Sequence, residues 1–285
     1  NLDGSSEIEI DSSCTQIYQY VFSNRDDITS VSIPDSVTSI GNGAFVCCAS
    51  LTSITIPSSV TSIGHSAFRY CSSLESVTIP SSVTSIGNVA FEDCSSLTSI
   101  SIPDSVTSIG SSAFSGCSSL TSVTIGEGVT SIRSGAFRYC YSLVYVVNKS
   151  SLEFNVGNYG TSGEILEIVS EESEVVFVDI DGNRYKDYNG ERYFIKNLDG
   201  SSEIEIDSSC TQIYRYAFYG RADITSVSIP EGVTSIGRSA FYNCTSLTSI
   251  TIPDSVTSIG DYAFQDCSSL TEINFNATNM SDLSS

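Results

Sequence analysis

Apolar and polar residues alternate in short stretches along the chain, and the stretch LTSITIP at 51–57 shows the pattern most simply. Successive side chains of a β-strand point to opposite faces. We therefore expect a short strand here, with Ile54 and Ile56 pointing inward and Ser53 and Thr55 pointing outward. The strand is predicted to end at the proline that follows, because proline has no N–H for a further ladder hydrogen bond.

The residues after this strand predict a chain that turns back across a core. Val60 and Ile63 are the next apolar positions, and Gly64 allows a sharp bend. The sequence SAF at 66–68 is predicted to open a short helical turn that packs beneath the strand. Cys71 closes the turn before the next strand begins.

The same pattern returns every 23 residues in nine recognisable copies, of which the first and seventh diverge most. One copy is too small to bury its own apolar face, whereas stacked copies share a continuous core. The period therefore predicts a solenoid with a rise of about 4.8 Å per coil, the spacing of paired strands. The phenylalanines that keep the step are Phe22, Phe45, Phe68, Phe91, Phe114, Phe137, Phe218, Phe241 and Phe264.

The repeated pattern CSSLTSITIPSSVTSIGxxAF resembles the BspA-like family of leucine-rich repeats over nearly all of 14–143 and 210–273. The resemblance implies an α/β solenoid, a right-handed and curved leucine-rich-repeat superhelix of mostly parallel β-strands with short helical turns. It also implies an exported or cell-surface protein whose relatives bind host or matrix proteins.

A second and longer repeat is superposed on the first. Residues 1–45 match 197–241 at an offset of 196, with 36 of 45 positions identical. Between the two arrays the period is lost, and alternating segments such as EILEIV and ERYFIKN are separated by Asp-Gly and Asn-Gly, which predicts an antiparallel β-meander. We therefore predict a first array over 1–143, an acidic meander that connects and caps over 144–196, and a second array over 197–285.

Charge excludes one class of partner. The formal net charge is −21, and residues 144–207 carry fourteen acidic and five basic side chains. Nucleic-acid binding needs clustered Lys and Arg, so no nucleic-acid partner is expected. No apolar run approaches the roughly 20 residues that span a bilayer, so no transmembrane segment is expected in this fragment.

Two residue types invite a search for chemistry. His65 occupies a variable slot, and no nucleophile or orienting partner recurs beside it, so we expect a surface residue. Seven of the ten cysteines lie one per coil in the same slot, without the paired ligands of a zinc site, and free buried thiols are expected. Disulfides in an exported protein are the alternative, at Cys47–Cys48 or at Cys14 and Cys210. No enzyme, metal site or cofactor is predicted.

Two local motifs have a second interpretation. The segment DIDGNRYKD at 179–187 predicts a hairpin turn. The alternative is a calcium loop, which is less favoured because the glycine comes too early for an EF-hand. Asn148, Asn243, Asn276 and Asn279 begin N-x-[ST] sequons, which matter only in a eukaryotic host.

The outward strand positions form the candidate binding surface. Short hydroxyls both donate and accept hydrogen bonds, which suits polar or sugar-bearing partners, although the same residues also keep a strand face soluble. A Ser-x-Thr ladder is also found in ice-binding solenoids. The candidate residues on the strands are Ser53, Thr55, Ser76, Thr78, Ser99, Ser101, Ser122, Thr124, Ser226, Ser228, Ser249 and Thr251. Those on the turns, where Arg and Tyr favour protein contacts, are Arg69, Tyr70, Arg138 and Tyr139.

These features predict a monomeric extracellular or cell-surface module that recognises a protein or glycoprotein, from the host or its matrix, through the solenoid surface. The alternative is a structural spacer that extends other domains from the cell surface and has no ligand of its own.

Overall fold

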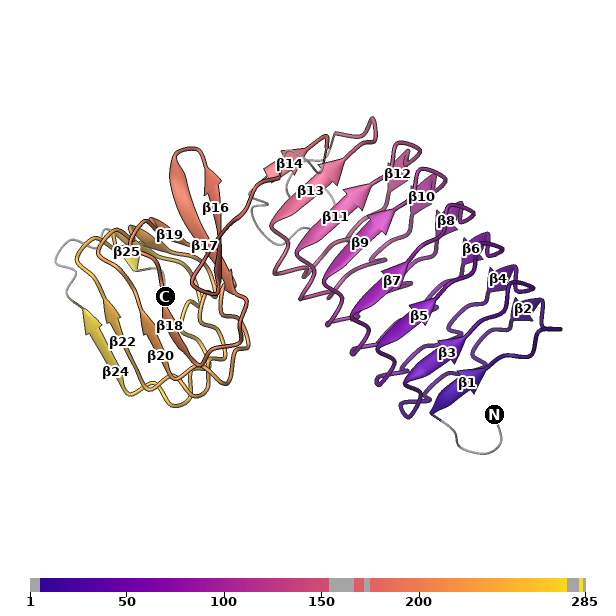
Figure 1. The fold of residues 1–285 in the computed structure, drawn as a ribbon, viewed down its shortest axis with the longest axis horizontal. Helices are drawn as coiled ribbons and strands as arrows, with labels where there is room; N and C mark the ends of the chain where they lie inside the picture. The colour runs from indigo at the N-terminus through magenta and orange to yellow at the C-terminus, as the bar shows by residue number, and fades with distance from the viewer. Residues whose placement is uncertain (1–5, 154–166, 172–174, 276–281, 284–285) are drawn as a thin grey trace. The chain divides into compact units, whose positions relative to one another are not determined.

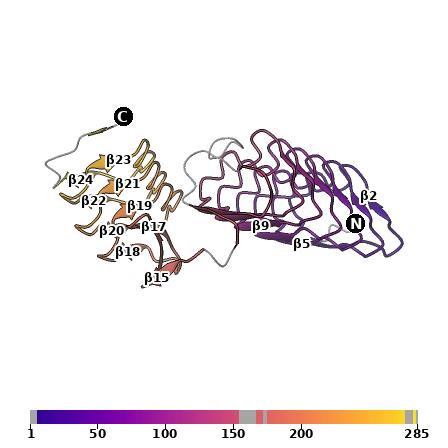
Figure 2. The same cartoon turned by 90° about the horizontal axis from the view of Figure 1, so that it is seen from above.

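The computed structural model describes residues 6–153, 167–171, 175–275 and 282–283. The chain divides into two compact units, with the boundary in the sequence between Val175 and Val176. In each unit the chain winds in coils of 23 residues, and each coil contributes two short strands that pair in parallel with the same strands of the neighbouring coils (Figures 1 and 2).

In unit 1 the first strand of each coil lies in one wall and the second strand in another. The strands of the first wall are β1 (Glu7–Glu9), β3 (Ser30–Ser32), β5 (Ser53–Thr55), β7 (Ser76–Thr78), β9 (Ser99–Ile102), β11 (Ser122–Ile125), β13 (Tyr145–Asn148) and β14 (Glu167–Val169). Those of the second wall are β2 (Gln16–Ile17), β4 (Ser39–Ile40), β6 (Ser62–Ile63), β8 (Ser85–Ile86), β10 (Ser108–Ile109) and β12 (Ser131–Ile132).

Unit 2 repeats this plan after a segment of three antiparallel strands, which is called the hairpin below. The hairpin strands are β15 (Val178–Ile180), β16 (Asn183–Tyr188) and β17 (Glu191–Asn197). The first wall holds β18 (Glu203–Glu205), β20 (Ser226–Ser228), β22 (Ser249–Ile252) and β24 (Glu272–Phe275). The second wall holds β19 (Gln212–Ile213), β21 (Ser235–Ile236), β23 (Ser258–Ile259) and β25 (Asp282–Leu283), and its sheet continues from β19 into β17, β16 and β15.

A typical coil contributes one phenylalanine, one cysteine and a set of aliphatic residues to the core, although Arg25 and Arg221 replace the cysteine in the first coil of each unit. Ile54 and Ile56 are buried, as their place in the strand predicted, and Phe68 and Cys71 are completely buried. The phenylalanine rings of successive coils stack along the axis, with centroids 5.2 Å apart between Phe45 and Phe68. The 23-residue period therefore produces a continuous apolar column in each unit.

The coils approach closely at their glycines. A Cβ added to Gly87 would lie 2.6 Å from the carbonyl carbon of Gly64 in the preceding coil. Real Cβ atoms do not come this near to backbone, so the neighbouring coil leaves no room for a side chain at Gly87.

The predicted short helical turns are wrong, since the described residues contain no helix. In the segment after Gly64, the backbone N–H groups of Ser66, Phe68 and Tyr70 donate to carbonyls of the next coil, while those between them bond three residues back. Ser66 and Tyr70 have φ angles of 56° and 64°, in the left-handed region. An α-helix needs right-handed φ angles at every residue and hydrogen bonds from each N–H to the carbonyl of residue i−4. This segment has neither, and it forms a third wall of turns that are linked from coil to coil.

The predicted antiparallel meander over 144–196 is wrong in its first part. β13 pairs in parallel with β11, and β14 pairs in parallel with β13, so the solenoid continues into this region. Val146 keeps the 23-residue step from Val123 and is completely buried. Antiparallel pairing begins at β15, where Asp181 and Gly182 form a two-residue hairpin turn with φ angles of 47° and 74°.

Candidate functional site

The strand face of unit 1 places the predicted hydroxyl residues side by side. Ser53 lies opposite Ser76 and Thr55 lies opposite Thr78 in the β5–β7 pair. Ser99 and Ser101 lie opposite Ser122 and Thr124 in the β9–β11 pair. The residues on β5, β7 and β9 are exposed and those on β11 are half-buried, so these strands present two parallel rows of hydroxyls.

The hydroxyls of these rows are not used to hold the coils together. No hydrogen bond joins them to another group in the described part of the chain. The threonine one position before the strand behaves differently, because Thr52 Oγ1 donates to Thr29 O at 3.4 Å and Thr121 Oγ1 donates to Thr98 O at 3.0 Å. The rows therefore keep their hydrogen-bonding capacity for solvent or a ligand.

The sequence prediction omitted members of the same rows. Ser30 and Ser32 of β3 occupy the same register, opposite Glu7 and Glu9 of β1. At the other end of the wall, Tyr145 lies opposite Ser122. The 23-residue step places all of these residues in the rows, and that step is the signal from which they could have been predicted.

The strand face of unit 2 is shorter and more acidic. Ser226 and Ser228 lie opposite Glu203 and Glu205, and Ser249 and Thr251 lie opposite Glu272 and Asn274. The hydroxyl rows of this unit are therefore flanked by carboxylates.

The four turn residues lie on the third wall and not on the strand face. The guanidinium of Arg69 lies 4.5 Å from the ring centroid of Tyr70 and pairs with Glu92. Arg138 lies at the same distance over Tyr139, and both tyrosines are 40% exposed. The two pairs are three coils apart, about 14 Å at one strand spacing per coil. They form two separate aromatic surfaces.

The two residues that first suggested chemistry have structural explanations. His65 is exposed, and its backbone N–H donates to Asn42 Oδ1 at 2.9 Å. Cys71 Sγ donates to the carbonyl of Phe45 at 3.2 Å, and this thiol-to-phenylalanine contact recurs in successive coils. All ten cysteines are free thiols in the structure. Burial raises the pKa of Cys48 to about 12, so a buried thiol of this stack is a poor nucleophile.

A pocket that the sequence did not reveal lies at the start of the strand face of unit 2. It has a volume of about 460 Å³, and its acidic lining residues are Asp181, Asp199, Glu203, Glu205 and Asp207. Hydrogen bonds from Ser201 and Asn197 lower the pKa of Asp199 to about 2. No group of three or more His, Cys, Asp or Glu side chains is placed to hold a metal ion among the described residues.

The sequons differ in their surroundings. Asn148 is half-buried and its Nδ2 donates to Leu152 O at 2.8 Å, so the atom that would carry a glycan is engaged. Asn243 is exposed in a turn, with a φ of 57°. Asn276 and Asn279 lie outside the described residues. Within the described residues, the structure has no helix that could cross a bilayer.

The chain is similar to proteins of known structure. It is 25% identical to a leucine rich cell surface protein from Faecalibacterium prausnitzii, with 99% of this chain and 92% of that chain covered and a TM-score of 0.42. It is 26% identical to a leucine-rich repeat protein from Bacteroides ovatus, with 94% and 80% covered and a TM-score of 0.42. No curated protein gives a significant sequence match.

The family is established by a family model. The model for the BspA type leucine rich repeat region matches residues 2–103, 38–159 and 190–285, which together include most of the chain. This family is a repeat scaffold, and no enzyme family is indicated. The chain therefore belongs to the BspA type leucine rich repeat family.

Proposed function

We propose that the protein is an extracellular or cell-surface binding module that recognises a protein or glycoprotein through the hydroxyl rows of unit 1. The observation that carries this proposal is the difference between neighbouring hydroxyls. Thr52 uses its hydroxyl to join two coils, whereas Ser53 and Thr55 leave theirs exposed.

The geometry of the rows supports a polar and extended ligand. The rows repeat at about 4.8 Å from coil to coil, and the two rows are separated by about 6.7 Å along each strand. Each serine or threonine hydroxyl can both donate and accept a hydrogen bond, which matches glycan hydroxyls and peptide groups. Solenoids commonly bind along the face that their strands create.

Charge narrows the class of partner. A net charge of −21 opposes binding to anionic polymers, and the rows of unit 1 between β3 and β11 contain no charged residue. The binding surface is therefore neutral within an acidic molecule, so a partner that is neutral at its point of contact and basic around it would be favoured.

The test compares two matched double variants. The first, Thr55→Arg with Ser101→Arg, places two bulky cations in the hydroxyl rows. The second, His65→Arg with Ser111→Arg, adds the same charges to the same two coils in the variable slot where Arg238 already occurs. Wild type and both variants are applied to arrays of immobilised matrix proteins and glycoproteins, and the affinity for each positive spot is measured.

We expect the first variant to lose about tenfold or more in affinity, a change of about 1.4 kcal/mol, while the control changes less than about twofold. Equal loss in both variants would refute binding through the rows. A wild-type protein that binds no member of the arrays would favour the spacer function instead.

A further inference from the structure

The first coils of the two units have nearly the same sequence but different surroundings. In unit 2, β19 of the first coil pairs in parallel with β17 of the hairpin. In unit 1, the equivalent strand β2 pairs with β4 on one side and forms the edge of its sheet. Tyr18 is 72% exposed at this edge, whereas its counterpart Tyr214 is 6% exposed.

The hairpin of unit 2 holds the first coil through backbone hydrogen bonds. The N–H of Thr211 donates to Arg192 O and the N–H of Tyr214 donates to Phe194 O, both at 2.9 Å. In return, the N–H of Arg192 donates to Thr211 Oγ1 at 2.8 Å. The hairpin thus continues the second wall by one further strand.

The same hairpin also completes the aromatic column. Phe194 stacks on Phe218 with ring centroids 4.7 Å apart, in the position that a phenylalanine of a preceding coil would have. Tyr193 contacts Tyr214 edge-on, with centroids 6.3 Å apart.

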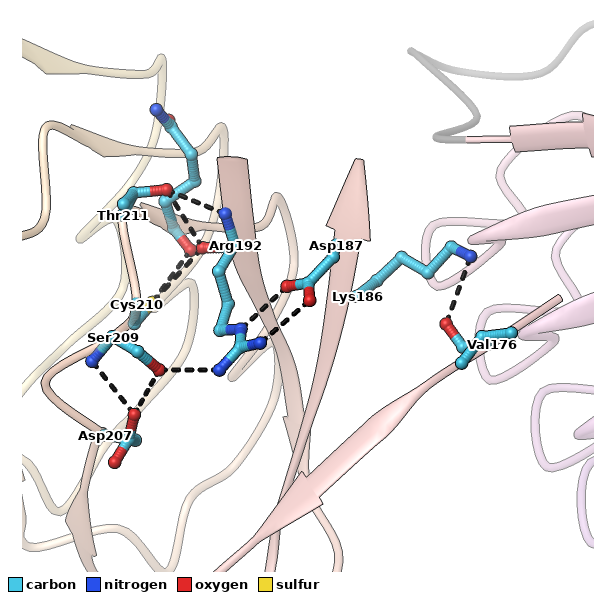
Figure 3. Close-up of polar contacts among 9 residues, drawn as sticks. Val176, Lys186, Asp187, Arg192, Asp207, Ser209, Cys210 and Thr211 are labelled. Atoms are coloured by element: carbon cyan, nitrogen blue, oxygen red, sulfur yellow. Dashed lines mark hydrogen bonds and ion pairs between the residues drawn. The ribbon is translucent and has the colours of Figure 1, made fainter. Parts of the chain in front are cut away.

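A charged clamp sits beside these contacts (Figure 3). Two N–H groups of the Arg192 guanidinium donate to the carboxylate of Asp187 within the hairpin, at 2.7 and 2.8 Å. A third donates to Ser209 Oγ of the first coil at 2.8 Å. The N–H of Asp207 donates to the hydroxyl of Tyr185 at 2.9 Å, which adds a further polar contact between the hairpin and the coil.

The receiving residues are all present in unit 1, 196 positions earlier. Asp11 accepts a hydrogen bond from the N–H of Ser13 at 2.8 Å, as Asp207 accepts one from Ser209 at 2.9 Å. The counterparts of the remaining contact residues are Thr15, Ile17, Tyr18 and Phe22.

The edge of unit 1 is also incomplete in its hydrogen bonding. The N–H groups of Thr15 and Tyr18 donate to no acceptor within the described part of the chain. The corresponding N–H groups of unit 2, those of Thr211 and Tyr214, donate to carbonyl groups of the hairpin. An exposed strand edge of this kind is a template for a further strand.

We propose that the exposed edge of the first coil, formed by Asp11–Phe22, is a docking surface for a β-hairpin with the sequence of residues 176–196, joined in cis before Asn1. The occupant is identified by the contacts above, because the residues that receive the hairpin in unit 2 are identical in unit 1. Cassettes of this chain would then connect end to end through one repeated joint.

The test places a second copy of residues 176–196 directly before Asn1, which reproduces the natural junction between Lys196 and Asn197. Amide hydrogen exchange is measured by NMR for Thr15 and Tyr18 at low protein concentration. Thr211 and Tyr214 serve as references within the same molecule. We expect the graft to slow exchange at Thr15 and Tyr18 by about tenfold or more, toward the rates of the two references.

The control graft carries Phe194→Asp and Arg192→Ala in the added copy only. It should leave Thr15 and Tyr18 exchanging as fast as in the unmodified chain. Unchanged exchange with the first graft would overturn the proposal, and so would equal protection by both grafts. Protection of the unmodified chain that rises with protein concentration would show that another molecule covers the edge, and would overturn the proposed occupant.

Discussion

The rings of Phe91 and Phe114, which belong to successive coils, lie 5.2 Å apart with their planes 1° from parallel. Both side chains are completely buried, and each belongs to the column that runs through unit 1. The strands β8 and β10 of the same two coils are also paired. The stacking of the rings and the pairing of the strands therefore require the same alignment of one coil on the next.

Truncation of a ring should cost more inside the column than at its end. We expect Phe91→Ala to lower the free energy of unfolding by about 3–5 kcal/mol, because it leaves a cavity between two rings. Phe22→Ala, in the first coil, should cost clearly less, since Phe22 stacks on one ring among the described residues, that of Phe45, whereas Phe91 stacks on two. Chemical unfolding followed by circular dichroism compares the two. Equal losses would contradict a column that is tighter at its centre.

Replacement of Gly87 by alanine tests whether a side chain at this position stabilises or destabilises the protein. Its φ is not in the left-handed region, so Ala in a roomy site would stabilise the protein by about 0.4–1 kcal/mol through the unfolded state. The backbone of Gly64 leaves no room for a Cβ, so we expect Gly87→Ala to be destabilising instead. A melting temperature above that of the wild type would contradict the close approach of the coils.

Val89 should be replaceable with a gain in stability. It is a β-branched residue with a φ of 49°, where Gly43 and Gly135 stand in other coils. The left-handed conformation costs a side chain about 1–2 kcal/mol, so Val89→Gly should stabilise by about 1 kcal/mol after the entropy of glycine is included. Val46→Gly, a valine outside the left-handed region, should destabilise, and denaturant midpoints measure both variants.

The thiols should separate into two reactivity classes. Cys14, Cys47 and Cys267 are partly exposed, whereas Cys71, Cys94 and Cys117 are completely buried. We expect maleimide to label the three partly exposed thiols in the native protein at pH 8, and all ten cysteines after denaturation without reductant. Fewer than ten reactive thiols would show that disulfides are present.

The same burial gives stability a dependence on alkaline pH. Burial raises the pKa of Cys48 to about 12 and that of Cys210 to about 11, above the ordinary thiol pKa of about 8.5. The unfolded chain therefore loses these protons first, so this stabilisation is complete below about pH 8.5 and declines as the pH rises through the folded values. Cys48→Ala should weaken the decline in unfolding free energy between pH 8.5 and 11.

Asp199 should titrate in strong acid. Hydrogen bonds from Ser201 and Asn197 lower its pKa to about 2, so its contribution to stability is present above the ordinary value of about 3.9 and is lost as the pH falls toward 2. We expect Ser201→Ala to raise this pKa toward its ordinary value, as measured by NMR titration of the carboxyl group. Ser202→Ala is the matched control and should leave the midpoint in place.

The repeat could be predicted from the sequence because each coil buries apolar residues at the same positions of the 23-residue period. The strand at 53–55, the inward Ile54 and Ile56, the buried Cys71 and the exposed His65 all follow from alternation and a fixed step. Stacked coils can share a core only if their apolar residues recur at a fixed step, so the spacing of apolar residues in the sequence reveals the coils directly.

The third wall could not be predicted from apolar spacing, because Ala67 and Phe68 would be buried in a helical turn as well. The signal lay in two other slots, where glycine, asparagine and aspartate recur in residues such as Gly43, Asn24 and Asp93. These residue types tolerate a positive φ. The pocket of unit 2 depends on how a hairpin folds over a coil, and no linear spacing expresses that arrangement.

The ladders of hydrogen bonds connect residues about one coil apart, from Ser82 to Val60 at 22 positions to Cys94 to Phe68 at 26. These hydrogen bonds join only neighbouring coils, so they form in the same way whatever the number of coils. Removal of residues 74–96 would join Ser73 to Leu97 within an unchanged CSSL sequence and would keep every remaining register. Gene slippage by whole 23-residue units could therefore shorten or lengthen the protein by about 4.8 Å at a time while its surface chemistry stayed the same.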